Sequence, residues 1–180
     1  MLPMLDAPRL RLRTLTEADV PAIFAIFSNA EALRYWSHGP MSDPAEADRL
    51  LDDIRRYAAA GTLFQWGVAR RETGEVIGTC TLHRIERAHR RAELGYIVKR
   101  ELWGNGYAHE ALTALLDHAF GTMGLHKLEA DIDPRNAASI RSVEKLGFKR
   151  EGHLRERYQI LGEIQDSLIY GLTGPEWRSR

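Results

Sequence analysis

The sequence predicts an α+β domain, a mixed α/β sheet flanked by helices in three layers. Two observations carry this prediction. The early strand-like segments follow one another as a hairpin, and later helical segments stand where they would connect strands. No Pro-, Gly- or Ser-rich linker divides the chain, so we expect one domain over residues 1–180.

The first half of the chain is expected to contain four strands and two helices. Leucines alternate with arginines in residues 9–15, which is typical of a strand with one buried face. Thr16 stands at the N-cap position of a helix reaching about Asn29, and Ser42 is expected to cap a second helix that stops at Gly61. Further strands are expected at residues 64–69, 76–85 and 93–98, the first two as a hairpin.

The second half is expected to run strand, helix, strand around its centre. An apolar stripe with helical spacing extends from Ala108 to Phe120, and glycines follow it. The segment 127–133 alternates like a strand, and a short helix over 137–146 is closed by Gly147. Two last strands, 157–160 and 166–172, are joined by a turn at Leu161 and Gly162.

Composition and charge bound the function. Hydrophobic residues make up 44% of the chain, and 25 basic residues balance 25 acidic ones, so we expect no global attraction to nucleic acid or to a membrane surface. The single Cys80 excludes an internal disulfide, and the opening residues lack the apolar core of a signal peptide. These features predict a cytoplasmic protein. Histidines and Cys80 lack metal-ligand spacing, which predicts no metal site.

The stretch "WGNGYAHEA", residues 103–111, places small residues at alternate positions before a helix. A helix start offers about four unpaired amides and roughly half a positive charge, so an anion can bind there if no side chain blocks it. Gly104, Gly106 and Ala108 leave those amides reachable. A plain tight turn explains the pattern equally well, and a dinucleotide fingerprint would require a small residue at His109.

Two motifs in order carry a resemblance to a known family. Residues 103–108 resemble the acyl-CoA motif of the GNAT N-acetyltransferases, with Trp103 in the position of the usual Gln or Arg. Residues 136–148, "NAASIRSVEKLGF", look like the second motif of that family. The opening, the run "AELGYIV" and the ending are similar to the ribosomal-protein N-terminal (alanine/serine) acetyltransferase branch, so the resemblance spans nearly the whole chain.

The resemblance implies a GNAT-like fold, with a largely antiparallel twisted sheet, and acetyl-CoA as cosubstrate without a metal. It places the pyrophosphate on the amides of a loop and the pantetheine arm beside the preceding strand end. The implied cofactor-binding residues are Ile97, Val98, Gly104, Asn105, Gly106, Tyr107, Ala108 and Asn136. Basic residues near the two motifs are expected to form a local positive funnel for this anion, namely Lys99, Arg100, Arg135, Arg141 and Lys145.

Acetyl transfer to an amine requires a neutral amine, stabilisation of the oxyanion and a proton for the leaving thiolate. Glu93 could accept a proton through water, or it could be a structural group at a strand end. The tyrosine that many relatives use for the thiolate is Val143 here, and the resemblance assigns that role to Ser139, which could instead be a helix cap. Asn136 is expected to contact pantetheine or the active site, or to form an Asx-turn.

The acceptor side is less constrained by the sequence. Tyr35 and Trp36, in a loop without periodicity, could form an aromatic wall over the acceptor or pack at the edge of the core. Tyr158 stands where some members of the branch carry a carboxylate, and we assign it to substrate binding. The preferred acceptor is a protein N-terminal α-amine, whose pKa near 8 needs only a weak base. A small-molecule amine, a CoA-binding module without turnover, and a homodimeric assembly stay open.

Overall fold

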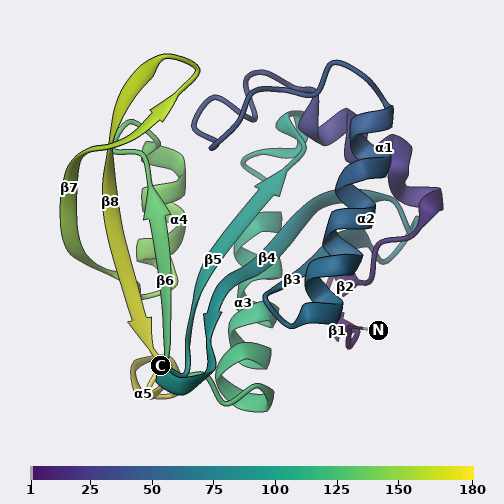
Figure 1. Ribbon diagram of the computed structural model, residues 1–180. Coiled ribbons are helices and arrows are strands. Elements are labelled where there is room, and N and C mark those ends of the chain that lie inside the picture. The colour runs from purple at the N-terminus through teal and green to yellow at the C-terminus, as the bar shows by residue number, and fades with distance from the viewer. Residues whose placement is uncertain (1) are drawn as a thin grey trace.

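The computed structural model describes residues 2–180, which form a single eight-stranded sheet with the order β1-β2-β3-β4-β5-β6-β8-β7 (Figure 1). Neighbouring strands are antiparallel except β5 and β6, which are parallel. The strands are β1 (Leu5–Asp6), β2 (Leu10–Arg13), β3 (Leu63–Arg70), β4 (Val76–Glu86), β5 (Arg91–Val98), β6 (Lys127–Ile132), β7 (Lys149–Ile160) and β8 (Glu163–Thr173). The expected mixed, largely antiparallel sheet is confirmed.

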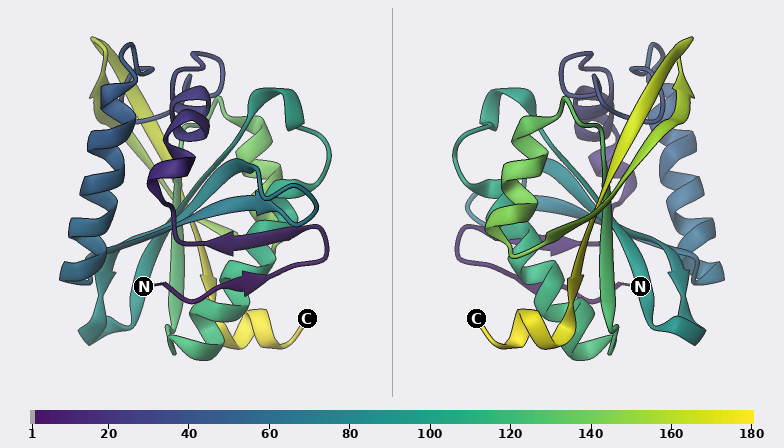
Figure 2. Two further views of the ribbon diagram at one scale, coloured as in Figure 1. Left: turned by 90° about the vertical axis from the view of Figure 1, so that its right-hand side faces the viewer. Right: turned by 90° about the vertical axis from the view of Figure 1, so that its left-hand side faces the viewer.

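Helices cover both faces of this sheet. Figure 2 shows α1 and α2 on one face and α3 and α4 on the other, which gives the expected three layers. The α-helices are α1 (Val20–Phe27), α2 (Ala45–Ala60), α3 (Tyr107–Asp117), α4 (Ala137–Lys145) and α5 (Gly174–Arg178). Short 3₁₀ turns lie at Glu17–Asp19, Arg87–His89 and Arg100–Leu102, and α3 continues as a π-helical turn over His118–Thr122. No helix among residues 2–180 is long and apolar enough to span a bilayer.

Each face of the sheet buries its own hydrophobic core. The larger core lies under α3 and α4 and contains Trp66 and Leu112, which are fully buried. The smaller core lies under α1 and α2 and contains Ile23 and Leu51. Because side chains alternate across a strand, the central strands β3, β4 and β5 contribute to both cores. The two helical layers are therefore held at fixed positions on the sheet between them.

The parallel pair in the middle of the sheet comes apart part of the way along its length. β5 pairs with β6 only from Arg91, opposite Lys127, to Glu93, opposite Glu129. Beyond Glu93, β5 continues to Val98 without a partner on this side, while β6 continues to Ile132 beside β8. Figure 1 shows the two strands diverging toward the top of the view. The divergence opens the sheet near its centre.

The observed elements agree with the expected ones except at several ends and except for β1 and α5, which were not predicted from the sequence. The expected hairpin of β3 and β4 and the turn at Leu161 and Gly162 are confirmed, and both turn residues have positive φ. β7 begins at Lys149 rather than at residue 157, because this edge strand is mostly exposed and lacks an apolar alternation. Ser42 does not cap α2, since its amide and hydroxyl donate to Glu46 Oε1 and the helix begins after Pro44.

Candidate active site

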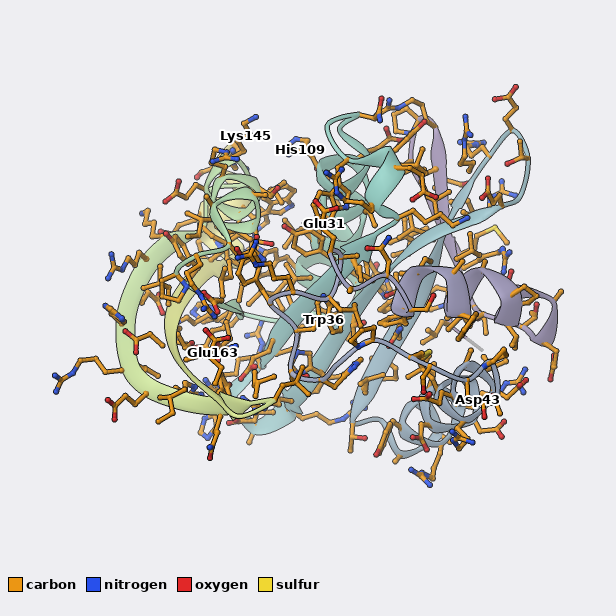
Figure 3. All side chains as sticks on the ribbon, turned by 90° about the horizontal axis from the view of Figure 1, so that it is seen from above. Glu31, Trp36, Asp43, His109, Lys145 and Glu163 are labelled. Carbon is orange, nitrogen blue, oxygen red and sulfur yellow. The ribbon has the colours of Figure 1, made fainter. Side chains whose placement is uncertain are left out.

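A cavity of about 420 Å³ lies where β5 and β6 diverge. Its walls come from β4, β5, β6, the start of α4, the loop of Tyr35–Ser37 and the β7–β8 hairpin. Figure 3, seen from above, places Trp36 on the loop, Glu163 on the hairpin, and His109 and Lys145 on the α3 and α4 side. Segments far apart in the sequence therefore meet at this one place.

The cavity opens to both faces of the sheet, because the side chains of β5 alternate. Leu94 and Tyr96 belong to or pack against the larger core under α3, whereas Ile97 belongs to the core under α1 and α2. Alternation puts Glu93 and Gly95 on the same face as Ile97. We call the α3 and α4 face, with the amides of residues 104–108, Tyr96, Asn136 and Ser139, the amide side. The opposite face, with His83, Arg84, Glu93 and the carboxylates of β6 and the hairpin, is the charged side.

The loop before α3 presents bare backbone to the solvent. Gly104 and Gly106 have φ of 80° and 79°, and Gly106 is the N-cap of α3. A Cβ on Gly104 would meet nothing within 4 Å, and one on Gly106 only Arg9 Nη2 at 3.5 Å. Among residues 2–180, no group accepts a hydrogen bond from the amides of residues 104–108. The stretch is thus a tight turn that also leaves its donors free.

Side chains in the same loop hold this turn in shape. The Asn105 amide donates to the carbonyls of Leu102 and Trp103, so its side chain braces the loop. The Trp103 indole donates to the carbonyl of Val98 at 2.8 Å, which ties the loop to the end of β5. Of the predicted binding residues, Gly104 to Ala108 therefore lie together at the mouth of α3, next to the end of β5.

The end of β5 packs closely on β4. Ile97 and Val98 are buried, and a Cβ on Gly78 would lie 2.3 Å from the Ile97 carbonyl oxygen. Only glycine allows this approach of the two backbones. The side chain of Ile97 faces the α1 and α2 core, and neither residue lines the cavity, so any contact of Ile97 with a ligand must come from its main chain.

The start of α4 shows which of its two polar residues, Asn136 or Ser139, caps the helix. Asn136 is the N-cap, and its Oδ1 accepts from the Ser139 amide at 3.1 Å, while its side-chain NH₂ has no partner among residues 2–180. The Ser139 hydroxyl does not cap the helix. It lies 3.3 Å from the Tyr96 hydroxyl, which donates to it. Burial raises the pKa of Tyr96 above its ordinary value of 10.0, so this phenol keeps its proton at neutral pH.

The charged side carries two candidate proton acceptors on neighbouring strands. Glu93 on β5 is paired with Arg84, whose Nη1 lies 3.0 and 3.2 Å from the two carboxylate oxygens. His83 on β4 stands opposite Glu93 in the sheet register and lines the cavity. Burial lowers the pKa of His83 below 6.5, and Arg84 adds to this, although Glu93 and Asp131 act in the other direction. His83 is therefore neutral at pH 7.

The carboxylates on β6, just after β6 and on β8 accept hydrogen bonds from other residues of the charged side. Asp131 accepts from the Tyr158 hydroxyl at 2.7 Å and from the Ser167 hydroxyl. Asp133 accepts from the Arg135 side chain and amide, and Asp166 from His153. Tyr158, predicted to bind substrate, thus lines the cavity through its bond to Asp131.

The aromatic loop residues lie at the edge of the cavity and of the core at once. Trp36 packs edge-on against Phe27, with ring centroids 5.5 Å apart, and also lines the cavity. Tyr35 stands beside the Arg135 guanidinium, whose Cζ lies 5.7 Å from the centroid of the Tyr35 ring. Trp36 therefore packs at the edge of the core and also lines the cavity, while its contact with the acceptor stays a prediction.

The expected positive funnel is largely neutralised by carboxylates. Lys99 pairs with Glu75, and Arg100 pairs with Glu31. Arg135 pairs with Asp133 and Glu163. Among residues 2–180, Arg141 and Lys145 form no such ion pair, and Lys145 shares a second concave region of about 720 Å³ with Gly106. Positive charge for an anion thus remains mainly near the α3 and α4 side.

Sequence reasoning missed several residues of the cavity. Tyr96, His83, Asp131 and Asp166 line it, but none had been proposed for the site. The polar face of β6, where Glu129 and Asp131 alternate with buried residues, is the one signal that could have found the acidic wall. Tyr96 and His83 are placed by sheet register, which one sequence does not reveal.

The residues that the structure describes offer neither a cysteine nucleophile nor a metal centre. Cys80 is buried, and burial raises the pKa of its thiol to about 12, so it is no nucleophile at neutral pH. Within residues 2–180, no three His, Cys, Asp or Glu side chains are grouped so that they could hold a metal ion.

Comparison with known proteins identifies the class. The acetyltransferase (GNAT) domain profile matches residues 9–149, so the chain belongs to the GNAT acetyltransferase family, as its motifs predicted. The sequence is 36% identical over 175 residues to the uncharacterized N-acetyltransferase YoaA of Bacillus subtilis, covering 97% of this chain and 99% of the relative. The protein is therefore an N-acetyltransferase.

Relatives of established name fall into two groups. A spermidine N(1)-acetyltransferase of Escherichia coli is 30% identical over 92% of this chain and 86% of its own length. A [ribosomal protein uS5]-alanine N-acetyltransferase of Escherichia coli is 27% identical over 96% of this chain and 92% of its own length. The predicted resemblance to the ribosomal-protein branch is thus confirmed, and the spermidine enzymes stand beside it.

Solved structures agree with the fold. A GNAT acetyltransferase from Bacillus anthracis superimposes with a TM-score of 0.87 at 23% identity, over 97% of this chain and all of that one. A spermidine N-acetyltransferase from Vibrio cholerae, in complex with CoA and spermine, gives a TM-score of 0.84 at 26% identity, over 94% and 98% of the two chains. The GNAT fold predicted from the motifs is confirmed.

Proposed function

We propose that this protein transfers the acetyl group of acetyl-CoA to the N-terminal α-amine of a protein or peptide by direct attack. The observation that carries the proposal is the divergence of β5 and β6 beside a loop with free amides. An unpaired strand edge can hydrogen-bond the amide-rich pantetheine arm, and the free amides of residues 104–108 can bind a pyrophosphate. These residues fit the cosubstrate.

The amide side has the groups that thioester cleavage needs. Acetyl-CoA supplies an activated acetyl group and a thiolate that must be protonated as it leaves. Ser139 and Tyr96 form a linked pair of hydroxyls at this point, and Ser139 can pass a proton to sulfur while drawing on Tyr96. The free NH₂ of Asn136 can donate to a carbonyl oxygen of the bound cosubstrate.

The α-amine as acceptor is supported by the weak bases of the charged side. Glu93 is engaged by Arg84, and His83 is held neutral with a lowered pKa. An α-amine loses its proton near pH 8, about two units below a lysine-like amine, so a weak base is sufficient for it. The relative that acetylates an alanine of ribosomal protein uS5 supports the same acceptor.

A second candidate acceptor is a small polyamine. The acidic wall of Asp131, Asp133 and Asp166 can attract a substrate with several positive charges, although arginines partly neutralise it. The spermidine acetyltransferases among the relatives support this candidate. The two candidates differ in what occupies the charged side and share the chemistry of the amide side.

Thiol release from acetyl-CoA tests the proposal directly. We would offer peptides beginning with Ala or Ser, the same peptides with blocked N-termini, and spermidine. Release with free but not with blocked peptides, and a lower kcat/KM for spermidine, is the expected result. Preference for spermidine would move the assignment to the second candidate. Tight CoA binding without release for any amine would indicate a binding module and contradict the proposal.

A further inference from the structure

His83 occupies a distinctive position on the charged side. It lies on β4 directly opposite Glu93, and its ring extends over Gly95 of β5, where a Cβ would lie 3.9 Å from Nε2. Gly95 precedes Tyr96, and both residues line the cavity. The imidazole nitrogen therefore faces the unpaired stretch of β5, across the strand from the Tyr96 and Ser139 hydroxyls.

The imidazole of His83 is free to exchange protons. Among residues 2–180, only the imidazoles of His38 and His153 take part in hydrogen bonds, so the ring of His83 has none. A register shift in β4 begins just after His83, where Arg84 has a φ of 48°. Such irregularities re-aim side chains, and here Arg84 turns to bind Glu93 instead of blocking His83.

The neighbouring carboxylate is less suited to accept a proton. Arg84 binds both oxygens of Glu93, so a proton could reach this carboxylate only by competing with that ion pair. A base works best when its pKa lies near the operating pH, which favours an imidazole. The charged groups around His83 are Arg84 on β4, Glu93 on β5 and Asp131 on β6.

We infer that His83 is the catalytic base of the acetyl transfer: its Nε2 accepts a proton from the acceptor ammonium, directly or through one water. The inference rests on the proposed function and assigns Glu93 to fixing Arg84 rather than to proton transfer. The ammonium loses two protons overall. One passes to His83 and then to water. The other leaves the nitrogen as the new N–C bond replaces the C–S bond. Ser139 gives its proton to the leaving sulfur, so that CoA departs as the thiol, and takes up this second proton from the nitrogen.

The pH dependence of three variants tests this assignment, with Ala- and Ser-initiated peptides and spermidine as acceptors. His83→Gln removes the titrating ring, Glu93→Gln removes the carboxylate, and His118→Gln changes a partly buried histidine on the π-helical turn, outside the cavity. We expect His83→Gln to lower kcat at pH 7 at least tenfold, with the KM for acetyl-CoA within about twofold. The deficit should shrink toward pH 9, because the amine then loses its proton unaided. Glu93→Gln should keep the loss of activity in acid but move its midpoint to lower pH, because it removes a carboxylate that raises the pKa of His83. His118→Gln should keep the wild-type profile.

Two further readouts separate a catalytic role from a structural one. Thermal unfolding of His83→Gln should match the wild type within a few degrees. NMR titration of the His83 ring in the wild-type protein should give a midpoint below 6.5. Two results would overturn this inference while leaving the proposed function intact. One is a wild-type rate and pH profile in His83→Gln. The other is a Glu93→Gln variant whose rate no longer falls as the pH is lowered. Absence of thiol release by the wild type with every amine would overturn the proposed function and this inference with it.

Discussion

The amide side and the charged side use their polar groups in opposite ways. On the amide side, the backbone donors of residues 104–108 and the NH₂ of Asn136 have no partner among residues 2–180. On the charged side, Glu93, Asp131 and Asp133 are all paired with arginines. Unpaired donors at the surface can receive a ligand without breaking a bond in the protein, whereas paired carboxylates must exchange partners.

This difference suggests that the amide side sets the affinity for the cosubstrate, whereas the charged side sets the choice of acceptor. The amide side can bind one kind of ligand, an extended anion with acceptor groups, and its shape depends on local backbone geometry. The charged side is assembled from β4, β6, the β7–β8 hairpin and the loop of Tyr35, so its surface can change with any of them. Relatives 30% and 27% identical to this chain are named for acceptors as different as spermidine and a ribosomal protein.

The largest expected effect is on turnover at the amide side. Ser139→Ala removes the hydroxyl bonded to Tyr96 but keeps the amide that Asn136 caps, so α4 stays intact. We expect kcat to fall about 100-fold, or about 2.7 kcal/mol, with an unchanged Kd for acetyl-CoA. Stopped-time thiol assays and calorimetry measure the two quantities. Tyr96→Phe should overlap with Ser139→Ala rather than add to it, and full additivity would argue against a linked pair.

The next largest effect tests the bare backbone. Gly106→Asp places a carboxylate beside the free amides, and we expect the Kd for acetyl-CoA to rise at least tenfold, about 1.4 kcal/mol. Gly106→Asn is the matched control, because Asn has the same shape and tolerates the φ of 79° equally well. It should raise Kd by less than about threefold. Equal losses in the two variants would show that shape, and not charge, controls this loop.

The motifs of the amide side could be found from sequence because they are local. Gly104, Gly106 and Ala108 lie within one turn of chain, and their chemistry depends on backbone that they expose themselves. Asn136 and Ser139 lie at one helix start. Even there, the sequence left the roles of the two open, since a hydroxyl near a helix start caps it as readily as it serves a distant partner such as Tyr96.

The charged side could not be found in this way, because its contacts depend on register and on tertiary packing. His83 meets Glu93 through the pairing of β4 with β5. Tyr158 reaches Asp131 across β8, from an edge strand whose exposed sequence showed no strand pattern over most of its length. The central order of strands and helices was predictable from periodicity, whereas the edge strands β1 and β7 were missed or shortened.

A smaller effect is expected from the paired carboxylates. Burial raises the pKa of Asp133, but hydrogen bonds from Arg135 outweigh it and hold the pKa below 3.8. A lowered pKa stabilises the fold above the unfolded-state value, and this contribution is lost as the pH falls through the folded-state value. Asp133→Asn should therefore cost about 1–2 kcal/mol at pH 7 and progressively less below pH 4. Denaturant titrations at pH 7, 4 and 3 measure the difference, and a gap that widens in acid would contradict the pairing.

The smallest effect is expected at the tip of the hairpin. Leu161 is 82% exposed, has a φ of 51° and lies against Gly39 of the loop beyond Trp36. Leu161→Asn should leave stability unchanged or raise it by up to about 1 kcal/mol, because Asn adopts positive φ more readily. Only the KM for the acceptor should change, by roughly twofold to fivefold. A changed Kd for acetyl-CoA would mean that the two sides of the cavity are not independent.

A crystal structure with bound acetyl-CoA tests the central assignment most directly. We predict that the pyrophosphate lies on the amides of residues 104–108, that the pantetheine arm follows β5 from Val98 toward Glu93, and that the sulfur lies within hydrogen-bonding reach of Ser139. Cosubstrate bound away from this loop, or a sulfur far from both Ser139 and Tyr96, would contradict the account.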